Sequence, residues 1–442
     1  MCPTPAMRSA PTGIRWRMLG LLTGISFVSY LERMNISVAA TFMIPELGLT
    51  EVQIGWVFSS FIFGYTALQI PSGWMGDRFG VRKVFVAAIM TWGVVTVLTG
   101  VIPGVVVSGG VASLACLVVL RFMLGVAQAP TYPVSARASV NWFPPTERAF
   151  VMATVMAGSS VGSTFTAPLV SWLMVTIGWR KSFVIVSLFA FGVALLYRWY
   201  ATDHPRDHHG VNPEELAIID RARFSSEKAV EVLEVKAARA HIWQLLQNRN
   251  VLLLTTSYFF LGYIFYFFVF WLFLYLTDVR GFTMLEGGLF TALPFVAASV
   301  MAPLGGRICD RLSERLGSRT GRRLVAMLGL GLSGILLLVG ANVTTPYVAI
   351  VALALCVGFG ESTEGAFWAS MTEITGSHSG TASAVMNMGF NLGGVVVTPL
   401  MPFLVRELGW PLALGSGALF AWLGSACWLG ISPPLGGVGD ER

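Results

Sequence analysis

Long apolar runs follow one another along almost the whole chain, separated by short polar segments. A run of about 20 apolar residues has the length that a helix needs to cross the hydrocarbon core of a bilayer. We therefore predict twelve membrane-spanning helices and an all-α membrane protein. The predicted spans cover residues 18–42, 52–75, 84–103, 112–137, 149–176, 181–201, 250–277, 285–309, 323–342, 347–371, 381–405 and 411–431.

One long hydrophilic stretch, residues 202–249, divides these spans six and six. The pattern predicts an N-terminal six-helix bundle over 1–201, a cytoplasmic linker over 202–249 and a C-terminal six-helix bundle over 250–442. Within the linker, "NPEELAIIDRARF" at 212–224 combines a helix start signal with helical periodicity, so we expect a surface helix there.

The two halves of the chain repeat each other. "PLVSWLMVTIGW" at 168–179 matches "PLMPFLVRELGW" at 399–410, with five of twelve positions identical. Other matches between the halves have nearly the same spacing along the chain. We predict two bundles related by pseudo-two-fold symmetry. Parallel repeats of this kind place a substrate site between the halves, near the midplane of the membrane.

A charged loop motif also recurs, as "GWMGDRFGVRK" at 73–83 and "GRICDRLSERLGSRTGRR" at 306–323. Asp77 in the first copy corresponds to Asp310 in the second. Because an aspartate can bind a helix N-terminus or neighbouring basic groups, we predict that Asp77, Arg78 and Asp310 form a conformational latch. The alternative is that Arg78 only helps to set the topology.

The distribution of charge predicts the orientation of the chain. Charged residues make up 12% of the sequence, about half the roughly 25% of soluble domains. Most lysines and arginines lie in segments on one side, and the opposite loops carry only Arg180, Lys181, Arg280 and Arg406. The positive-inside rule then places both termini in the cytoplasm. It also explains the net charge of +6 without any binding of nucleic acid.

The residues of common catalytic and metal sites do not gather in the predicted spans. The five cysteines form no CxxC pair, and all five histidines fall outside the apolar runs. We therefore expect no disulfide framework, metal site or cofactor. No phosphate-binding loop is followed by a catalytic lysine, which argues against an enzyme or an ATP-driven pump.

Ionisable residues inside apolar spans indicate function, because a membrane rarely tolerates them for structure alone. Five lie well inside the predicted spans: Glu32, Arg33, Arg121, Glu361 and Glu364. Arg33 and Arg121 are candidates to bind an anion. A guanidinium is permanently charged, and its planar fork matches a carboxylate or a phosphate.

Structural ion pairs are the alternative role for both arginines. Glu32 and Arg33 are about 100° apart around a helix axis, so they cannot share one face. Tyr30 comes three residues before Arg33 and does share its face, either as a substrate contact or as packing. Gln128 follows Arg121 by two helical turns, so it faces the same way and can orient an anion or a water.

Six stretches carry a resemblance to a known family: "YLERMNIS", "GYTALQIPSGWMGDRFG", "RFMLGVAQAPTYP", "NWFPPTERA", "RGFTMLEGGLFTALP" and "GTASAVMNMGFNLGG". The chain is similar to the major facilitator superfamily. Within it the chain closely resembles the anion:cation symporters, which include bacterial sugar-acid permeases and vesicular glutamate and phosphate carriers. The resemblance covers nearly the whole chain. It implies uptake of a small organic anion, usually with protons, by alternating access in a monomeric carrier of the bacterial inner membrane.

The resemblance also implies residues of a binding cavity. Tyr65 matches a substrate-side tyrosine of the family, and Asn391 matches a position at the cavity. Ser160 is the equivalent of Asn391 when the two halves of the chain are aligned. We expect Trp368 to stack on the substrate, although an aromatic residue in a span more often only packs.

Two positions depart from the family pattern. Glu32 stands where the family usually has aspartate, and Gln128 where it has a proton-coupling glutamate. "GFGE", which ends at Glu361, aligns with "GVAQ", which ends at Gln128. These two residues are separated along the chain by the same number of positions as Asp310 and Asp77 of the charged loop motif. We therefore hypothesise that Glu361 supplies the missing proton-binding acid beside Glu364, because two close carboxylates in a low dielectric cannot both ionise at small cost. Alternatively, both glutamates pair with the two arginines and never titrate.

The leading hypothesis is a proton-coupled secondary transporter for a sugar acid or another carboxylate, with Glu32 or a glutamate of the tenth span carrying the proton. An organic-anion exchanger or a facilitative carrier without proton coupling is the second hypothesis, and Gln128 favours it. A membrane sensor on the same fold is a third, but the linker and tails are short for a signalling domain. The expected partners are the anion, the proton and the lipid bilayer.

Overall fold

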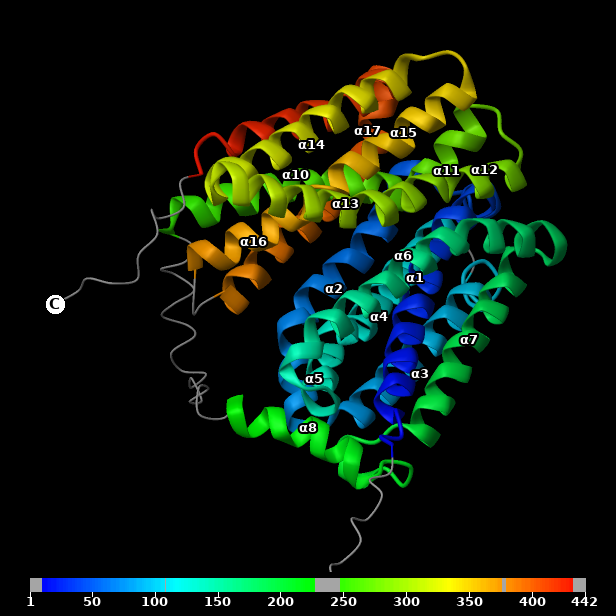
Figure 1. The fold of residues 1–442 in the computed structure, drawn as a ribbon. Helices are drawn as coiled ribbons and strands as arrows, with labels where there is room; N and C mark the ends of the chain where they lie inside the picture. Colours follow the sequence, from blue (N-terminus) through cyan, green and yellow to red (C-terminus); the bar gives the residue numbers. More distant parts are fainter. Residues whose placement is uncertain (1–9, 108, 227–246, 376–378, 432–442) are drawn as a thin grey trace, which may run out of the picture.

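The computed structural model describes residues 10–107, 109–226, 247–375 and 379–431. Helices dominate this part of the chain, which contains no β-sheet (Figure 1). The short elements are the 3-10 turn η1 (Pro205–Asp207) and the π-helical turn η2 (Tyr275–Val279). The α-helices are α1 (Ile14–Leu47), α2 (Glu51–Phe79), α3 (Val81–Val101), α4 (Gly110–Gln128), α5 (Thr131–Trp142), α6 (Pro145–Ile177), α7 (Trp179–Tyr200), α8 (Pro213–Ser226), α10 (Arg249–Phe270), α11 (Leu272–Leu274), α12 (Met284–Thr291), α13 (Leu293–Leu316), α14 (Ser318–Asn342), α15 (Pro346–Glu361), α16 (Glu364–Thr375) and α17 (Ser379–Cys427).

These helices account for the twelve predicted spans. Within the described ranges, nine helical segments are long and apolar enough to cross a bilayer, some of them formed by two consecutive helices. Helices α1 and α2, of 34 and 29 residues, are also long enough but carry more polar residues. Helix α17 contains two spans, because its backbone turns at Gly409. The protein is therefore an all-α membrane protein of twelve transmembrane helices, as predicted.

The turn at Gly409 has a counterpart in the first half of the chain. Gly409 has φ 79° and ψ 164°, and Gly178, between α6 and α7, has φ 84° and ψ 156°. Both conformations lie at positive φ, which glycine adopts readily and other residues avoid. The two glycines are equivalent positions of the repeated segments 168–179 and 399–410, so the repeat preserves a backbone turn as well as residues.

The helices form two groups (Figure 1). Helices α1 to α7 pack with one another in the first group, and α10 to α17 in the second. The groups contact each other mainly through α2 against α17 and through α6 against α12 and α13. The exact division of the chain into bundles and linker stays a prediction, and residues 227–246 of the predicted linker lie outside the described residues.

Helix α8, which begins within the predicted surface helix, is attached to the start of α1. Glu215 of α8 is fully buried and accepts hydrogen bonds from the backbone N–H groups of Ile14 (3.1 Å) and Arg15 (3.0 Å), and from the Thr12 hydroxyl. A carboxylate there satisfies N–H groups that the first turn of a helix leaves free. Arg15 in turn pairs with Glu147 at the start of α6 over 3.3 Å. We call this end of the molecule the α8 end.

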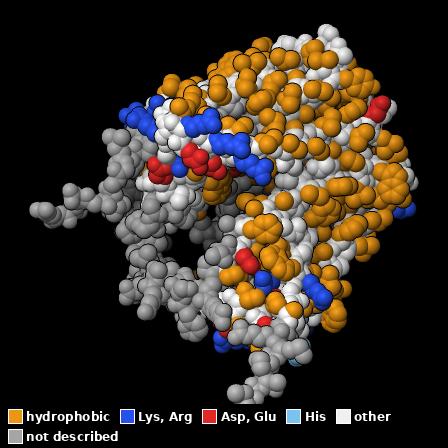
Figure 2. Space-filling view, in the orientation of Figure 1, with side chains coloured by type: hydrophobic (Ala, Val, Ile, Leu, Met, Phe, Trp, Pro, Cys, Tyr) orange, Lys and Arg blue, Asp and Glu red, His pale blue; other side chains and the backbone are white. Residues whose placement is uncertain are grey.

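Large apolar side chains cover the flanks of both groups, while charged side chains gather at the helix ends (Figure 2). Aromatic and aliphatic residues that are more than half exposed include Trp56, Phe63, Phe165, Trp172, Leu188 and Leu195. An apolar belt of this extent has no favourable contact with water but matches the hydrocarbon of a bilayer. The protein is an integral, multi-pass membrane protein.

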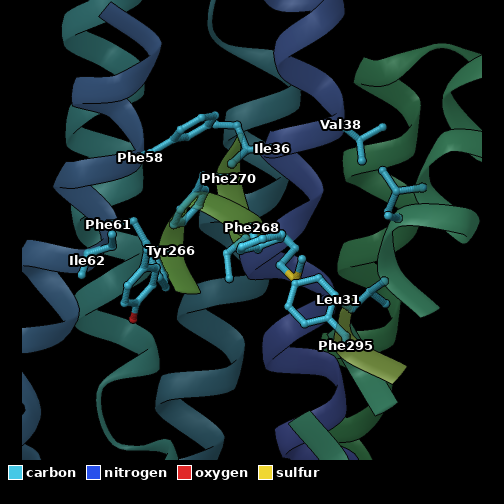
Figure 3. Packing of buried hydrophobic residues seen from close by; sticks show 14 of the residues in the cluster. Leu31, Ile36, Val38, Phe58, Phe61, Ile62, Tyr266, Phe268, Phe270 and Phe295 are labelled. Carbon is cyan, nitrogen blue, oxygen red and sulfur yellow. The ribbon is translucent and has the colours of Figure 1, made fainter. Parts of the chain in front are cut away.

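The two groups pack tightly at the end opposite α8. Helix α1 runs away from α8, so α2 starts at the far end, and Phe58 and Ser59 lie in its first half. Phe58 stacks on Phe270 with 4.7 Å between ring centroids and meets Trp271 edge-on at 5.3 Å (Figure 3). The Ser59 hydroxyl donates to the Val395 carbonyl over 2.9 Å. These contacts join α2 to helices of the other group.

Candidate binding cavity

A cavity of about 830 Å³ lies between the two groups of helices. Its α2 residues, Tyr65 and Gln69, follow Phe58 and Ser59 along the helix, so the cavity occupies the half of the molecule nearer the α8 end. Figure 2 shows the molecule hollowed between the groups. Eight residues predicted from the sequence line it: Tyr30, Arg33, Tyr65, Ser160, Glu361, Glu364, Trp368 and Asn391.

Arg33 is a buried cation in the cavity wall, with only 3% of its surface exposed. Its Nε donates to Oε1 of Gln128 over 3.4 Å, and its Nη2 has no hydrogen-bond partner among the residues that the structure describes. It forms no ion pair within the described ranges. Arg33 is thus a charge that the protein itself does not neutralise at close range.

Aromatic rings hold the guanidinium of Arg33 in place. Its Cζ lies 4.4 Å from the ring centroid of Tyr30, 4.8 Å from that of Tyr65 and 5.1 Å from that of Phe61. Ring faces attract a cation without neutralising its charge. The contact with Tyr30 agrees with the spacing argument that put both residues on one face of α1.

Gln128 lies behind Arg33 and is fully buried. Its Nε2 donates to the Ser29 carbonyl over 3.0 Å, which leaves Oε1 to accept from Arg33. The amide therefore bridges α4 to α1 and orients the guanidinium. Gln128 does not line the cavity wall, so it can affect a bound substrate only through its hydrogen bond with Arg33.

Arg121 and Glu32 also lie outside the cavity wall. Arg121, 1% exposed, donates to the backbone carbonyl of Glu32 (3.3 Å) and to Oδ1 of Asn35 (3.0 Å). The Glu32 carboxylate accepts a hydrogen bond from the Thr96 hydroxyl over 3.1 Å and attracts Arg121 electrostatically. The guanidinium of Arg121 is thus directed at α1 and not at the cavity in this conformation, and its contact with an anion stays a prediction.

Glu364 lies on the opposite side of the cavity, in the second group of helices. The Tyr258 hydroxyl is 2.9 Å from both of its carboxylate oxygens, and the Trp368 indole Nε1 donates to Oε2 over 2.7 Å. Glu361 lines the same wall. Within the described ranges neither glutamate pairs with Arg33 or Arg121, so the alternative of closed ion pairs is not what the structure contains.

The helices that carry Gln128 and Glu361 end at these two residues. Helix α4 ends at Gln128 and α15 ends at Glu361, and short breaks separate them from α5 and α16. The predicted spans 112–137 and 347–371 each comprise such a pair of helices, and Gly110–Trp142 and Pro346–Thr375 are each long and apolar enough to form one span. The breaks fall at equivalent positions of the repeat, and residues shortly after them, such as Tyr132 and Glu364, line the cavity.

The remaining predicted residues lie in two places. Asn391 accepts a hydrogen bond from the Tyr266 hydroxyl over 2.7 Å in the cavity wall, which Ser160 also lines. Asp77 is at the surface of the α8 end, where it pairs with Arg137 of α5 over 3.2 Å.

Arg78 contacts the ring of Trp74 of its own helix, with its Cζ 5.1 Å from the centroid. Asp310 is exposed near the end of α13. The three residues predicted to form a latch are therefore not brought into one cluster here.

Three tyrosines of the cavity wall were not singled out from the sequence: Tyr132, Tyr258 and Tyr266. The sequence indicated these residues only by placing a tyrosine hydroxyl inside an apolar run, where a buried phenol needs a hydrogen-bond partner. This indication is weak, because tyrosine also packs well in ordinary contacts between helices.

Comparison with known proteins identifies related chains. The family model described as Major Facilitator Superfamily matches residues 22–316 and 312–441. A probable sulfoacetate transporter of Cupriavidus necator is 35% identical over 427 residues, covering 95% of this chain and 94% of the relative. A D-galactonate transporter of Escherichia coli O6:H1 is 28% identical over 433 residues, covering 96% and 97%.

A solved structure shares the fold. A bacterial homologue of the human lysosomal transporter Spinster, in an inward-facing and occupied conformation, superposes with a TM-score of 0.74 over 96% of this chain and 97% of the other. At 16% sequence identity, this likeness concerns the fold alone.

Proposed function

The chain belongs to the major facilitator superfamily, and from this premise we propose that it carries a small organic anion across the bacterial inner membrane by alternating access. The proposed substrate is a sugar acid or another carboxylate, moved together with protons. The relatives named above, a probable sulfoacetate transporter and a D-galactonate transporter, support an organic acid as cargo. The basic segments at the α8 end support a cytoplasmic location for that end and for both termini.

The observation that carries the proposal is the unneutralised charge of Arg33 in the cavity wall. A buried cation without a counter-ion is costly, and an anion that binds it offsets that cost. The free Nη2 of Arg33 leaves part of the guanidinium fork available for a carboxylate. An organic anion is therefore the cargo that best completes this site.

Uptake of labelled D-galactonate and related acids into proteoliposomes tests this proposal. We expect Arg33→Gln to abolish uptake, and Arg33→Lys to retain a small part of it, because an ammonium keeps the charge but not the fork. Arg17→Gln is the matched control, since Arg17 is an exposed arginine outside the cavity and outside the charged loop motif. Uptake by Arg33→Gln at the wild-type rate would overturn the anion site.

We further propose that proton coupling uses the acidic residues Glu361 and Glu32. Glu361 lies in the cavity wall without an ion pair in the described part of the chain, so a proton there would lower the negative charge beside an incoming anion. Closing an empty cavity would bury the charge of Arg33, whereas closing a loaded one buries a neutralised pair. This difference supports coupled movement of anion and proton.

Glu361→Gln decides whether the first of these acids is needed. We expect this variant to lose anion accumulation driven by a proton gradient while it keeps exchange of internal for external anion. Unchanged proton-driven uptake would remove Glu361 from the coupling scheme. Wild-type uptake that needs internal anion but no proton gradient would instead favour the exchanger, the function with which Gln128 is more compatible.

The moving parts in this proposal are the bundles 1–201 and 250–442, joined by the linker 202–249, in a monomeric carrier. Rocking of one bundle against the other would close the cavity at the α8 end and open the tightly packed end. The exposed Asp77–Arg137 pair and the recurring Asp310 would then stabilise one of the two states as a latch.

A further inference from the structure

The cavity has opposite charges on its two sides. Arg33, from the first group of helices, is the only cation among the described residues that line it. Glu361 and Glu364, from the second group, are the only acids in the same described lining. A substrate that spans the cavity therefore meets a cation at one end and carboxylates at the other.

We propose that this arrangement selects monoanions whose far end carries a hydrogen-bond donor, most favourably an ammonium group. We also propose that it disfavours dianions, so that its selectivity differs from that of the relative named for sulfoacetate, which carries two acidic groups. The proposal rests on the proposed function, because it assumes that the anionic end binds at Arg33. It adds the charge requirement at the opposite end of the same substrate.

Glu364 is built to act as an acceptor. Two donors are directed at its oxygens: the Tyr258 O–H, which lies 2.9 Å from both of them, and the Trp368 N–H, 2.7 Å from Oε2, an arrangement that suits an ionised carboxylate. Its negative charge has no cationic partner within the described part of the chain. A donor on the substrate, charged or neutral, is the complement that is missing.

The surroundings of Glu364 also suit an ammonium group. Tyr258, Trp368 and Phe390 line the cavity beside it, with 4.9 Å between the ring centroids of Tyr258 and Phe390 and 6.4 Å between those of Tyr258 and Trp368. Aromatic faces next to a carboxylate form a favourable environment for a cation. A hydroxyl gains only the hydrogen bond, so an amine is expected to bind more tightly than an alcohol.

A second anionic group has no cation to receive it among the described residues of the wall. Arg121, the other arginine inside the spans, is outside the wall and already donates to Asn35 and to the Glu32 carbonyl. A dianion would therefore bring an unpaired negative charge into a cavity that already holds Glu364. Like charges a few ångströms apart repel strongly where the dielectric is low.

Three acids with one skeleton test the proposal: D-galactonate, galactarate and 6-amino-6-deoxygalactonate. They differ only at carbon six. This carbon carries a hydroxyl group in D-galactonate, is the carbon of a second carboxylate in galactarate, and carries an ammonium group in the amino acid. Binding to the purified full chain is measured by titration calorimetry at neutral pH. We expect the amine to bind most tightly, the alcohol less tightly and the diacid weaker than the alcohol by about tenfold or more.

The variant Glu364→Gln, which keeps acceptor capacity but removes the charge, identifies the residue responsible. We expect it to raise galactarate affinity by about tenfold and to remove the advantage of the amine, while galactonate changes little. Glu314→Gln is the matched control, since Glu314 is exposed and outside the cavity, and it should leave all three affinities unchanged.

The outcomes separate this inference from the function on which it rests. Galactarate binding as tightly as galactonate overturns the charge selection and leaves the anion carrier intact. An equal loss for all three acids in Glu364→Gln overturns the selective role and shows a structural one. Failure of all three acids to bind the wild type overturns the sugar-acid site itself and the selection with it.

Discussion

Arg33 and Gln128 join α1 to α4 inside the first group of helices, with Nε donating to Oε1 over 3.4 Å. The Gln128 amide contributes an acceptor but no charge, so the guanidinium stays positive toward the cavity. The contact with the Ser29 carbonyl fixes which way the amide points. The charge of the proposed anion site therefore depends on Gln128, which does not line the cavity.

Gln128→Glu is expected to make anion binding depend on pH. In acid the new carboxyl is neutral and can donate to the Ser29 carbonyl while it accepts from Arg33. When it ionises, it neutralises Arg33 and repels that carbonyl, so we expect anion affinity to fall about tenfold between about pH 5.5 and pH 8. Calorimetric titration with D-galactonate across this range measures the effect, and the wild type should change less. Equal pH profiles for the two proteins would contradict it.

Arg121→Gln is expected to reduce stability, because Arg121 and Glu32 attract each other in a buried setting. Arg121 also donates to Asn35 and to the Glu32 carbonyl, and a buried polar group that loses its partner costs about 1–3 kcal/mol, more when it is charged. Adding Glu32→Gln to the Arg121→Gln variant removes the remaining charge and should recover part of the loss. Thermal unfolding in detergent measures all three variants. A double variant that melts below Arg121→Gln would show that the two side chains are not coupled in this way.

Gly55→Trp is expected to shift the protein away from the conformation described here. A Cβ atom at Gly55 would collide with the Thr398 backbone oxygen of the other group, so a larger side chain cannot fit while that end stays packed. Opening it should close the α8 end and slow alkylation of a Met152→Cys reporter in the cavity wall. Gly20→Trp is the control, because nothing lies within 4 Å of a Cβ atom there. Unchanged alkylation would argue against rocking of the bundles.

His208 is expected to make docking of the segment before α8 sensitive to acid. Burial lowers the pKa of His208 below its ordinary value of 6.5, and its Nδ1 accepts from the Gly210 N–H over 3.1 Å, as a neutral ring can. As the pH falls through 6.5, His208 binds a proton in the unfolded chain before it does so in the folded protein, so the free energy of unfolding decreases toward lower pH. We expect the melting temperature of wild type to fall more between about pH 7.5 and 5.5 than that of His208→Asn. His209→Asn, at an exposed neighbour, should follow the wild type.

The twelve spans could be predicted because span length and apolarity are properties of single segments. The ends of α4 at Gln128 and of α15 at Glu361 could not be predicted, because the apolar pattern of a span marks its length and not a turn inside it. The repeat was the exception. A correspondence found in the sequence carried over to a pair of backbone turns at Gly178 and Gly409.

For the cavity, the sequence supplied the residue types but not their directions. Arg33 and Arg121 are equivalent as arginines inside spans, and only packing directs one to the cavity and the other to Asn35. Spacing along one helix was informative, as for Tyr30 and Arg33. The contacts of Glu364 with Tyr258 join helices that are far apart in the chain, so spacing could not reveal them.

The stacked rings of Phe58 and Phe270 have a thermal consequence. In the proposed alternating-access cycle these rings separate and water reaches them, while apolar surface is covered at the other end of the molecule. Exposure of apolar surface to water raises the heat capacity. If the two ends expose different apolar areas when they open, the free-energy difference between the two conformations is a curved function of temperature. The proportion of carriers open at each end will then change with growth temperature, even when anion and proton concentrations stay constant.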